Sequence, residues 1–142
     1  MINLVIRILK SSFSMPVWVQ IWIYFFLIPA NFSGLFLLHY VSGFWIAVLG
    51  AGAIFINMGI LFLNGGFSKV LAIPHLLFWI PLQIILLFRY LLAPDLSDFE
   101  QTYILVVMII NGISIVLDIY DTKEWLNGNR DVAGFPGEPV KL

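Results

Sequence analysis

The sequence contains no cysteine, which excludes disulfide bonds, thiolate metal sites and a cysteine nucleophile. Histidine is scarce too, with His39 and His75 as the two copies in the chain. A membrane haem with paired histidines needs both ligands at one depth, whereas these two are expected near opposite faces of the membrane. A haem with a single histidine ligand is the alternative that remains. We expect no metal and no cofactor.

Charged residues are also few. The 142 residues include 7 basic and 8 acidic side chains, or 11% of the chain, against about 25% in a soluble domain. Hydrophobic residues make up 61%, and the mean hydropathy is +1.01. This composition excludes an ordinary soluble domain and indicates an integral membrane protein. We expect the lipid bilayer as a partner and no nucleic-acid partner.

What the sequence does have is long apolar runs. A bilayer core about 30 Å thick requires about 20 apolar residues per helical span. Runs of this kind cover residues 17–38, 44–63, 70–92 and 103–120. The sequence therefore predicts an all-α, multi-pass protein in which residues 1–130 form one transmembrane four-helix bundle. Residues 131–142 are rich in glycine and proline and are predicted to be a flexible tail.

The distribution of basic residues predicts the orientation. Of the seven, Arg89 stands apart, and the other six fall on one side of the predicted spans: Arg7, Lys10, Lys69, Lys123, Arg130 and Lys141. By the positive-inside rule, that side is cytoplasmic and holds both termini. Residues 1–10 are apolar apart from a few polar positions, which predicts a short interfacial helix. The first long run has no small-residue cleavage site, so we expect it to be retained.

Small residues in the second run predict close helix packing. Gly50, Gly52 and Gly59 offer close backbone approach, which replaces the hydrophobic driving force inside lipid. The partner helix can belong to this bundle, to a second copy in a homo-oligomer or to a larger membrane complex.

One polar stripe interrupts the fourth run. Asn111, Ser114, Asp118 and Asp121 are spaced by three, four and three residues, so a helix places them on one face. An acid in a membrane helix normally faces protein or water rather than lipid. Because the third and fourth runs are antiparallel, His75 should lie at the depth of Asp118. These five residues form the candidate functional or partner-binding stripe. Two interpretations stay open: the pair fixes the helix ends, or it has a chemical role such as proton relay.

Several short motifs in the same two runs resemble a known family. They are Pro74-His75 with Trp79-Ile80-Pro81, then Asn111-x-x-Ser114 with Asp118-x-x-Asp121, and finally Gly128-x-Arg130. Together they resemble small, uncharacterised four-span proteins of the bacterial inner membrane. The resemblance implies a bacterial inner-membrane location and implies no activity.

Three classes of function remain. The first is an accessory or structural subunit of a membrane complex or homo-oligomer, without enzymatic activity, since helix packing alone would serve it. The second is a small transporter or channel built from a dimer of four-span subunits. The third is a membrane enzyme with a site at His75 and Asp118.

Overall fold

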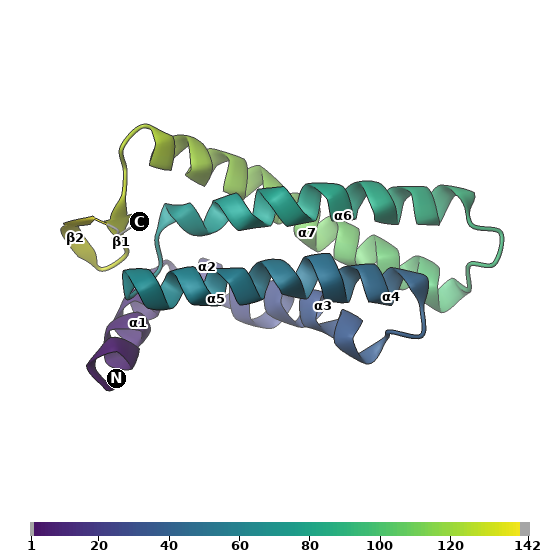
Figure 1. Cartoon of the computed structure of the whole chain (residues 1–142), viewed down its shortest axis with the longest axis horizontal. Coiled ribbons are helices and arrows are strands. Elements are labelled where there is room, and N and C mark those ends of the chain that lie inside the picture. The colour runs from purple at the N-terminus through teal and green to yellow at the C-terminus, as the bar shows by residue number, and fades with distance from the viewer. Residues whose placement is uncertain (1, 140–142) are drawn as a thin grey trace.

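The computed structural model describes residues 2–139 as a bundle of four long helical spans, with a short helix before it and a β-hairpin after it (Figure 1). The short helix is α1 (Ile2–Ser14), and the first span consists of α2 (Val17–Ile21), η1 (Trp22–Leu27), α3 (Ile28–Phe32) and η2 (Ser33–Phe36). The second span consists of α4 (Val41–Trp45), η3 (Ile46–Ala51) and α5 (Gly52–Asn64), and the third of η4 (Lys69–Leu71) and α6 (Ala72–Leu92). The fourth span is α7 (Asp98–Leu126), and the hairpin consists of β1 (Asp131–Val132) and β2 (Phe135–Pro139). The predicted all-α four-helix architecture is confirmed.

The four spans are long and apolar enough to cross a membrane. They cover Val17–Phe36, Val41–Asn64, Lys69–Leu92 and Asp98–Leu126, and no more than 33% of the most apolar window of any span is buried. The apolar side chains that remain point outward and require a non-aqueous environment. The chain is therefore a multi-pass membrane protein. Figure 1 shows α1 and the hairpin at the same end of the bundle.

The fourth span is longer than the predicted run of residues 103–120. Its helix begins at Asp98, where the Ser97 side chain accepts a hydrogen bond of 3.2 Å from the backbone N–H of Glu100. Such an N-cap satisfies a donor that the helix itself leaves unpaired. Apolarity alone missed these turns because they are polar.

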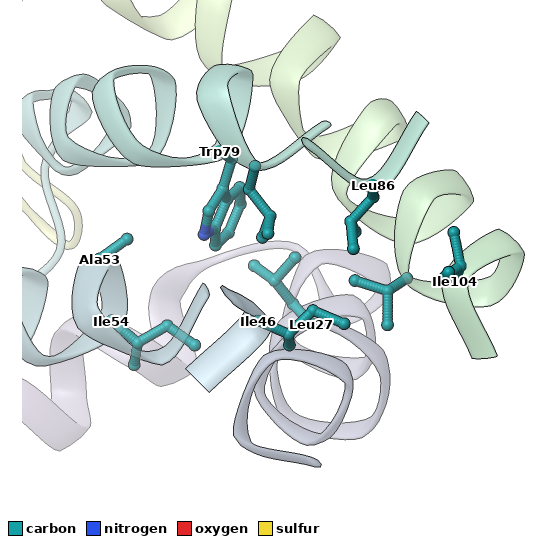
Figure 2. Close-up of a cluster of buried hydrophobic side chains, with 9 residues drawn as sticks. Leu27, Ile46, Ala53, Ile54, Trp79, Leu86 and Ile104 are labelled. Atoms are coloured by element: carbon teal, nitrogen blue, oxygen red, sulfur yellow. The ribbon is translucent and has the colours of Figure 1, made fainter. Parts of the chain in front are cut away.

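The core lies between the spans. Ile46, Trp79, Leu82, Leu86 and Ile104 are fully buried. Figure 2 shows the Trp79 ring pointing from α6 toward the neighbouring spans. Its indole N–H donates to the carbonyl of Gly50 over 3.3 Å, so the polar atom of this large side chain is satisfied within the core.

The three predicted packing glycines lie in different surroundings. A Cβ atom on Gly50 would lie 2.5 Å from Oδ1 of Asn31 in the first span, so the two helices approach closely there. A Cβ on Gly52 or Gly59 would meet no atom within 4 Å. The prediction of a contact inside the bundle is therefore wrong for Gly52 and Gly59. A contact between these two glycines and a second copy of the chain stays a prediction.

The predicted flexible tail is instead a hairpin for residues 131–139. Strands β1 and β2 are antiparallel, with Val132 opposite Phe135. Val132 is 1% exposed, and the backbone N–H of Ala133 donates to the carbonyl of Phe67 over 2.8 Å. Gly134 has a φ of 79°, which glycine adopts without strain. The turn residues were correctly recognised as breakers, but they join two short strands. Residues 140–142 of the predicted tail lie outside the described part of the chain.

The hairpin also contacts α1. The guanidinium of Arg7 lies 2.7 Å from the carboxylate of Glu138 and 4.4 Å from the ring centroid of Phe135. One turn further along the same face of α1, Ser11 accepts a hydrogen bond of 2.8 Å from the backbone N–H of Phe67. The predicted short N-terminal helix is thus present and is held to the bundle by both the loop at Phe67 and the hairpin.

Candidate functional site

A polar cluster lies where the second, third and fourth spans meet, near the hairpin end of the bundle. His75 occupies the first turn of α6, and its ring stacks on Trp79 one turn later, with 3.9 Å between the ring centroids. Its Nε2 atom lies 2.7 Å from Nδ2 of Asn57 in α5. The same Nδ2 donates to the carbonyl of Leu71 over 2.8 Å.

These contacts determine which nitrogen of His75 carries the proton. A backbone carbonyl only accepts, so the Asn57 atom that bonds Leu71 must be the amide nitrogen. The Nε2 atom of His75 then has to accept from that nitrogen, which leaves the proton of the neutral ring on Nδ1.

The protonated nitrogen faces Asp118 of α7. Nδ1 of His75 lies 3.2 Å from Oδ2 of Asp118, and each of the two side chains is 14% exposed. The structure therefore places the predicted pair together. The two atoms are not aligned for a hydrogen bond, however, and neither has another hydrogen-bond partner among residues 2–139. Oδ1 of Asn57 is likewise buried without a hydrogen-bond partner in this part of the chain.

Asp121, one turn further along α7, belongs to a separate ion pair. Its carboxylate lies 3.8 Å from Nζ of Lys69, which also lies 3.5 Å from Glu124. This group is more exposed than the His75 pair, and exposed ion pairs contribute little to stability.

The other two residues of the stripe hold the first and fourth spans together. Asn111 and Asn31 are fully buried and exchange hydrogen bonds of 2.8 and 3.0 Å. Ser114 accepts a hydrogen bond of 3.0 Å from the indole N–H of Trp22. The stripe is therefore divided. Asn111 and Ser114 form hydrogen bonds with the first span inside the bundle, whereas Asp118 and Asp121 lie near the hairpin end.

A cavity of about 840 Å³ lies beside the polar cluster. Its wall comes from α1, all four spans and the hairpin, and its inner end reaches Leu27 and Ile54 of the core. Most of the lining is apolar, and the polar side chains on it include Asn57, Lys69, His75, Asp118, Asp121 and Asp131. Its size lies within the range of about 300–1,000 Å³ that small-molecule sites usually have.

A second polar cluster, at the opposite end of the bundle, was not predicted from the sequence. Glu100 is 2% exposed and accepts two hydrogen bonds from Arg89, of 3.2 and 3.1 Å, and one of 2.8 Å from the Ser42 hydroxyl. Arg89 also donates to Asp95 over 2.9 Å, and this bond holds the pKa of Asp95 below its usual range. The available signal was a lone arginine near the end of the third run, followed by acids in the next helix. Because its charges pair with one another, this cluster ties three spans together.

The chain offers no group of three or more histidines and acids that could hold a metal ion, within the described residues 2–139. His39 lies in the turn between the first two spans, where its ring contacts that of Tyr40, and does not approach His75.

No protein-family model, curated protein or solved structure matches this chain. The resemblance of its motifs to a bacterial inner-membrane family therefore stays a prediction, and the function has to be argued from the geometry.

Proposed function

We propose that this chain is a small-molecule-binding protein of the bacterial inner membrane, and that the ligand occupies the cavity beside Asn57, His75 and Asp118. The observation that carries the proposal is the cavity of about 840 Å³, whose mostly apolar wall includes the residues Asn57, His75 and Asp118. A large apolar pocket with a few convergent polar groups is the usual form of a ligand site. The proposal concerns binding and assigns no reaction.

The division of the polar stripe supports this choice over the accessory subunit. A subunit that bound its partner through the stripe would present Asn111 and Ser114 outward, but both are buried and bonded to the first span. The residues Asn57, His75 and Asp118, by contrast, belong to the lining of the cavity.

An accessory or oligomeric role remains the second candidate because of one observation. Gly52 and Gly59 lie seven residues apart on an open part of α5, where a second helix could approach closely. The two roles are compatible, since this face lies outside the residues that line the cavity.

Native mass spectrometry of the protein released from mild detergent tests the proposal. We expect a bound molecule in the wild type and its loss in Ile23→Trp, which puts a larger side chain into the cavity lining. The matched control is Ile113→Trp, on an exposed position of α7 outside the cavity. Equal adducts in both variants, or none in the wild type, would contradict the proposal.

A further inference from the structure

The first span packs on the rest of the bundle through only part of its length. At the end away from the hairpin, α3 and η2 pack on η3, and Asn31 bonds to Asn111 of α7. Further along the span, the indole of Trp22 in η1 still reaches Ser114 of α7. Nearer the hairpin, α2 packs on α1 and η1, its neighbours along the chain, and none of its residues is buried. This end of the first span therefore stands away from the other three spans.

The cavity occupies the space that this separation leaves. Its lining follows the first span from Pro16 to Phe32, about 24 Å of helix at 1.5 Å per residue. Tyr24 of the first span and Met58 of the second both line it, and both are nearly half exposed. The cavity is therefore open on one side rather than enclosed. Because both spans are of the kind that crosses a membrane, this open side faces the hydrocarbon of the bilayer.

The polarity of the cavity wall changes from one end to the other. Lys69, Asp121 and Asp131 line it near the hairpin. Its inner end is apolar and reaches the buried side chains of Leu27 and Ile54. A membrane lipid has the same order, with a polar headgroup at the surface and hydrocarbon toward the centre of the bilayer.

The polar cluster in the middle of the wall keeps its unpaired atoms out of the cavity. Oδ1 of Asn57, Nδ1 of His75 and Oδ2 of Asp118 are all buried. The exposed part of this wall is mostly apolar, so a polar ligand would give up hydrogen bonds with water and regain few. A hydrocarbon chain gives up none, and it gains contact along the whole lining.

We infer that the ligand is a bilayer lipid, one hydrocarbon chain of which enters the cavity sideways, past α2, and lies along the first span with its end near Leu27 and Ile54. The headgroup stays at the membrane surface on the hairpin side. This inference rests on the proposed function and names the chemical class of the ligand. Entry through the open side keeps the chain in an apolar medium throughout, whereas a ligand from water would have to pass the charged end of the cavity.

Photo-crosslinking in a bilayer tests the inference. The full chain is placed in phosphatidylcholine vesicles that contain a small fraction of phosphatidylcholine with a diazirine at the end of one acyl chain. After illumination, mass spectrometry of the peptides locates the adducts. We expect adducts on Leu27 or Ile54, which are 6% and 8% exposed and line the cavity. Leu82 and Val107 are the internal controls, because they are buried outside the cavity and should carry none.

Two variants show whether the labelled chain lies in the cavity. Ile23→Trp, which narrows the cavity, should lower the labelling of Leu27 and Ile54 severalfold. Ile113→Trp, at an exposed position outside the cavity, should leave it unchanged. In the native mass spectrum of the wild type, the bound molecule should have the mass of a membrane lipid.

The failures of the lipid inference and of the proposed function can be told apart. Adducts confined to outward-facing residues such as Phe25, together with a bound molecule that Ile23→Trp abolishes, would overturn the lipid and leave the proposed function standing. Labelled Leu27 without a bound molecule in the native spectrum would show lipid as solvent in the cavity, which overturns both. A dimer with an unlabelled cavity would assign the open side to a second copy instead. If Ile23→Trp does not fold, the comparison of Leu27 with Leu82 in the wild type decides.

Discussion

His75 and Asp118 show what sequence reasoning can do for single residues. Antiparallel spans place the start of one run at the depth of the end of the next, and this rule was enough to bring the two side chains together. Asn57, which fixes the proton on His75, could not be assigned in the same way. Asn57 is a single polar side chain in an otherwise apolar run, so the sequence indicates that it faces protein but does not indicate which neighbouring span it meets.

The pair can be tested at the same scale by a double-mutant cycle. We expect Asp118→Ala to lower the free energy of unfolding by about 1–3 kcal/mol, because Nδ1 of His75 loses the acceptor that it faces. The double variant with His75→Phe should lose less than the sum of the single losses. The measurement is reversible unfolding in mixed detergent micelles.

His39→Phe supplies the control for this cycle, because His39 lies at the other end of the bundle. Its effect should simply add to that of Asp118→Ala. Additivity of the His75 and Asp118 changes as well would show that the two side chains do not interact.

The positions of the helical spans were easier to predict from the sequence than the π-helical segments within them. Hydropathy located all four spans, since the bilayer imposes a length that apolar composition reports directly. The π-helical segments η1 and η3 have no counterpart in such a pattern, because their residues are as apolar as those of an α-helix. Gly50, which Asn31 approaches closely, lies within η3.

Two glycines of the second span give a matched pair of substitutions. Gly50→Ala would place a Cβ 2.5 Å from Oδ1 of Asn31 and should destabilise the bundle by about 1–3 kcal/mol. Gly52→Ala meets open space and should be neutral, or stabilising by up to about 1 kcal/mol from helix propensity. Thermal unfolding of both variants in detergent measures the difference. A loss of stability in Gly52→Ala together with a smaller solubilised particle would instead indicate a contact with a second copy.

The hairpin was missed because glycine and proline were interpreted as signs of an unstructured tail. What holds it is a buried apolar contact rather than its ion pair, since Val132 is 1% exposed and Glu138 is about half exposed. We therefore expect Val132→Ser to release the hairpin and Glu138→Gln to change little. Hydrogen exchange at the backbone N–H of Ala133 reports this directly, because that group is bonded to Phe67. Faster exchange in Glu138→Gln than in Val132→Ser would reverse this ranking.

At the scale of the whole molecule, the orientation in the membrane can be tested because the chain has no cysteine of its own. Asp98→Cys and Asn129→Cys each introduce a unique thiol, at opposite ends of α7. We expect a membrane-impermeant maleimide, added to intact cells, to label the first and not the second, since the basic residues predict that the Asn129 end is cytoplasmic. Labelling of both from one side would contradict the antiparallel arrangement.

Arg7 precedes every span, whereas Glu138 follows the last of them, and the two are in contact. During translation these segments leave the ribosome in that order, with the whole bundle made in between. A nascent chain that has inserted four spans but not yet released residues 131–139 lacks one wall of the cavity, because the hairpin lines it. The wall of the cavity can therefore be completed only after residues 131–139 have followed the fourth span out of the ribosome, so insertion of the four spans alone does not form it.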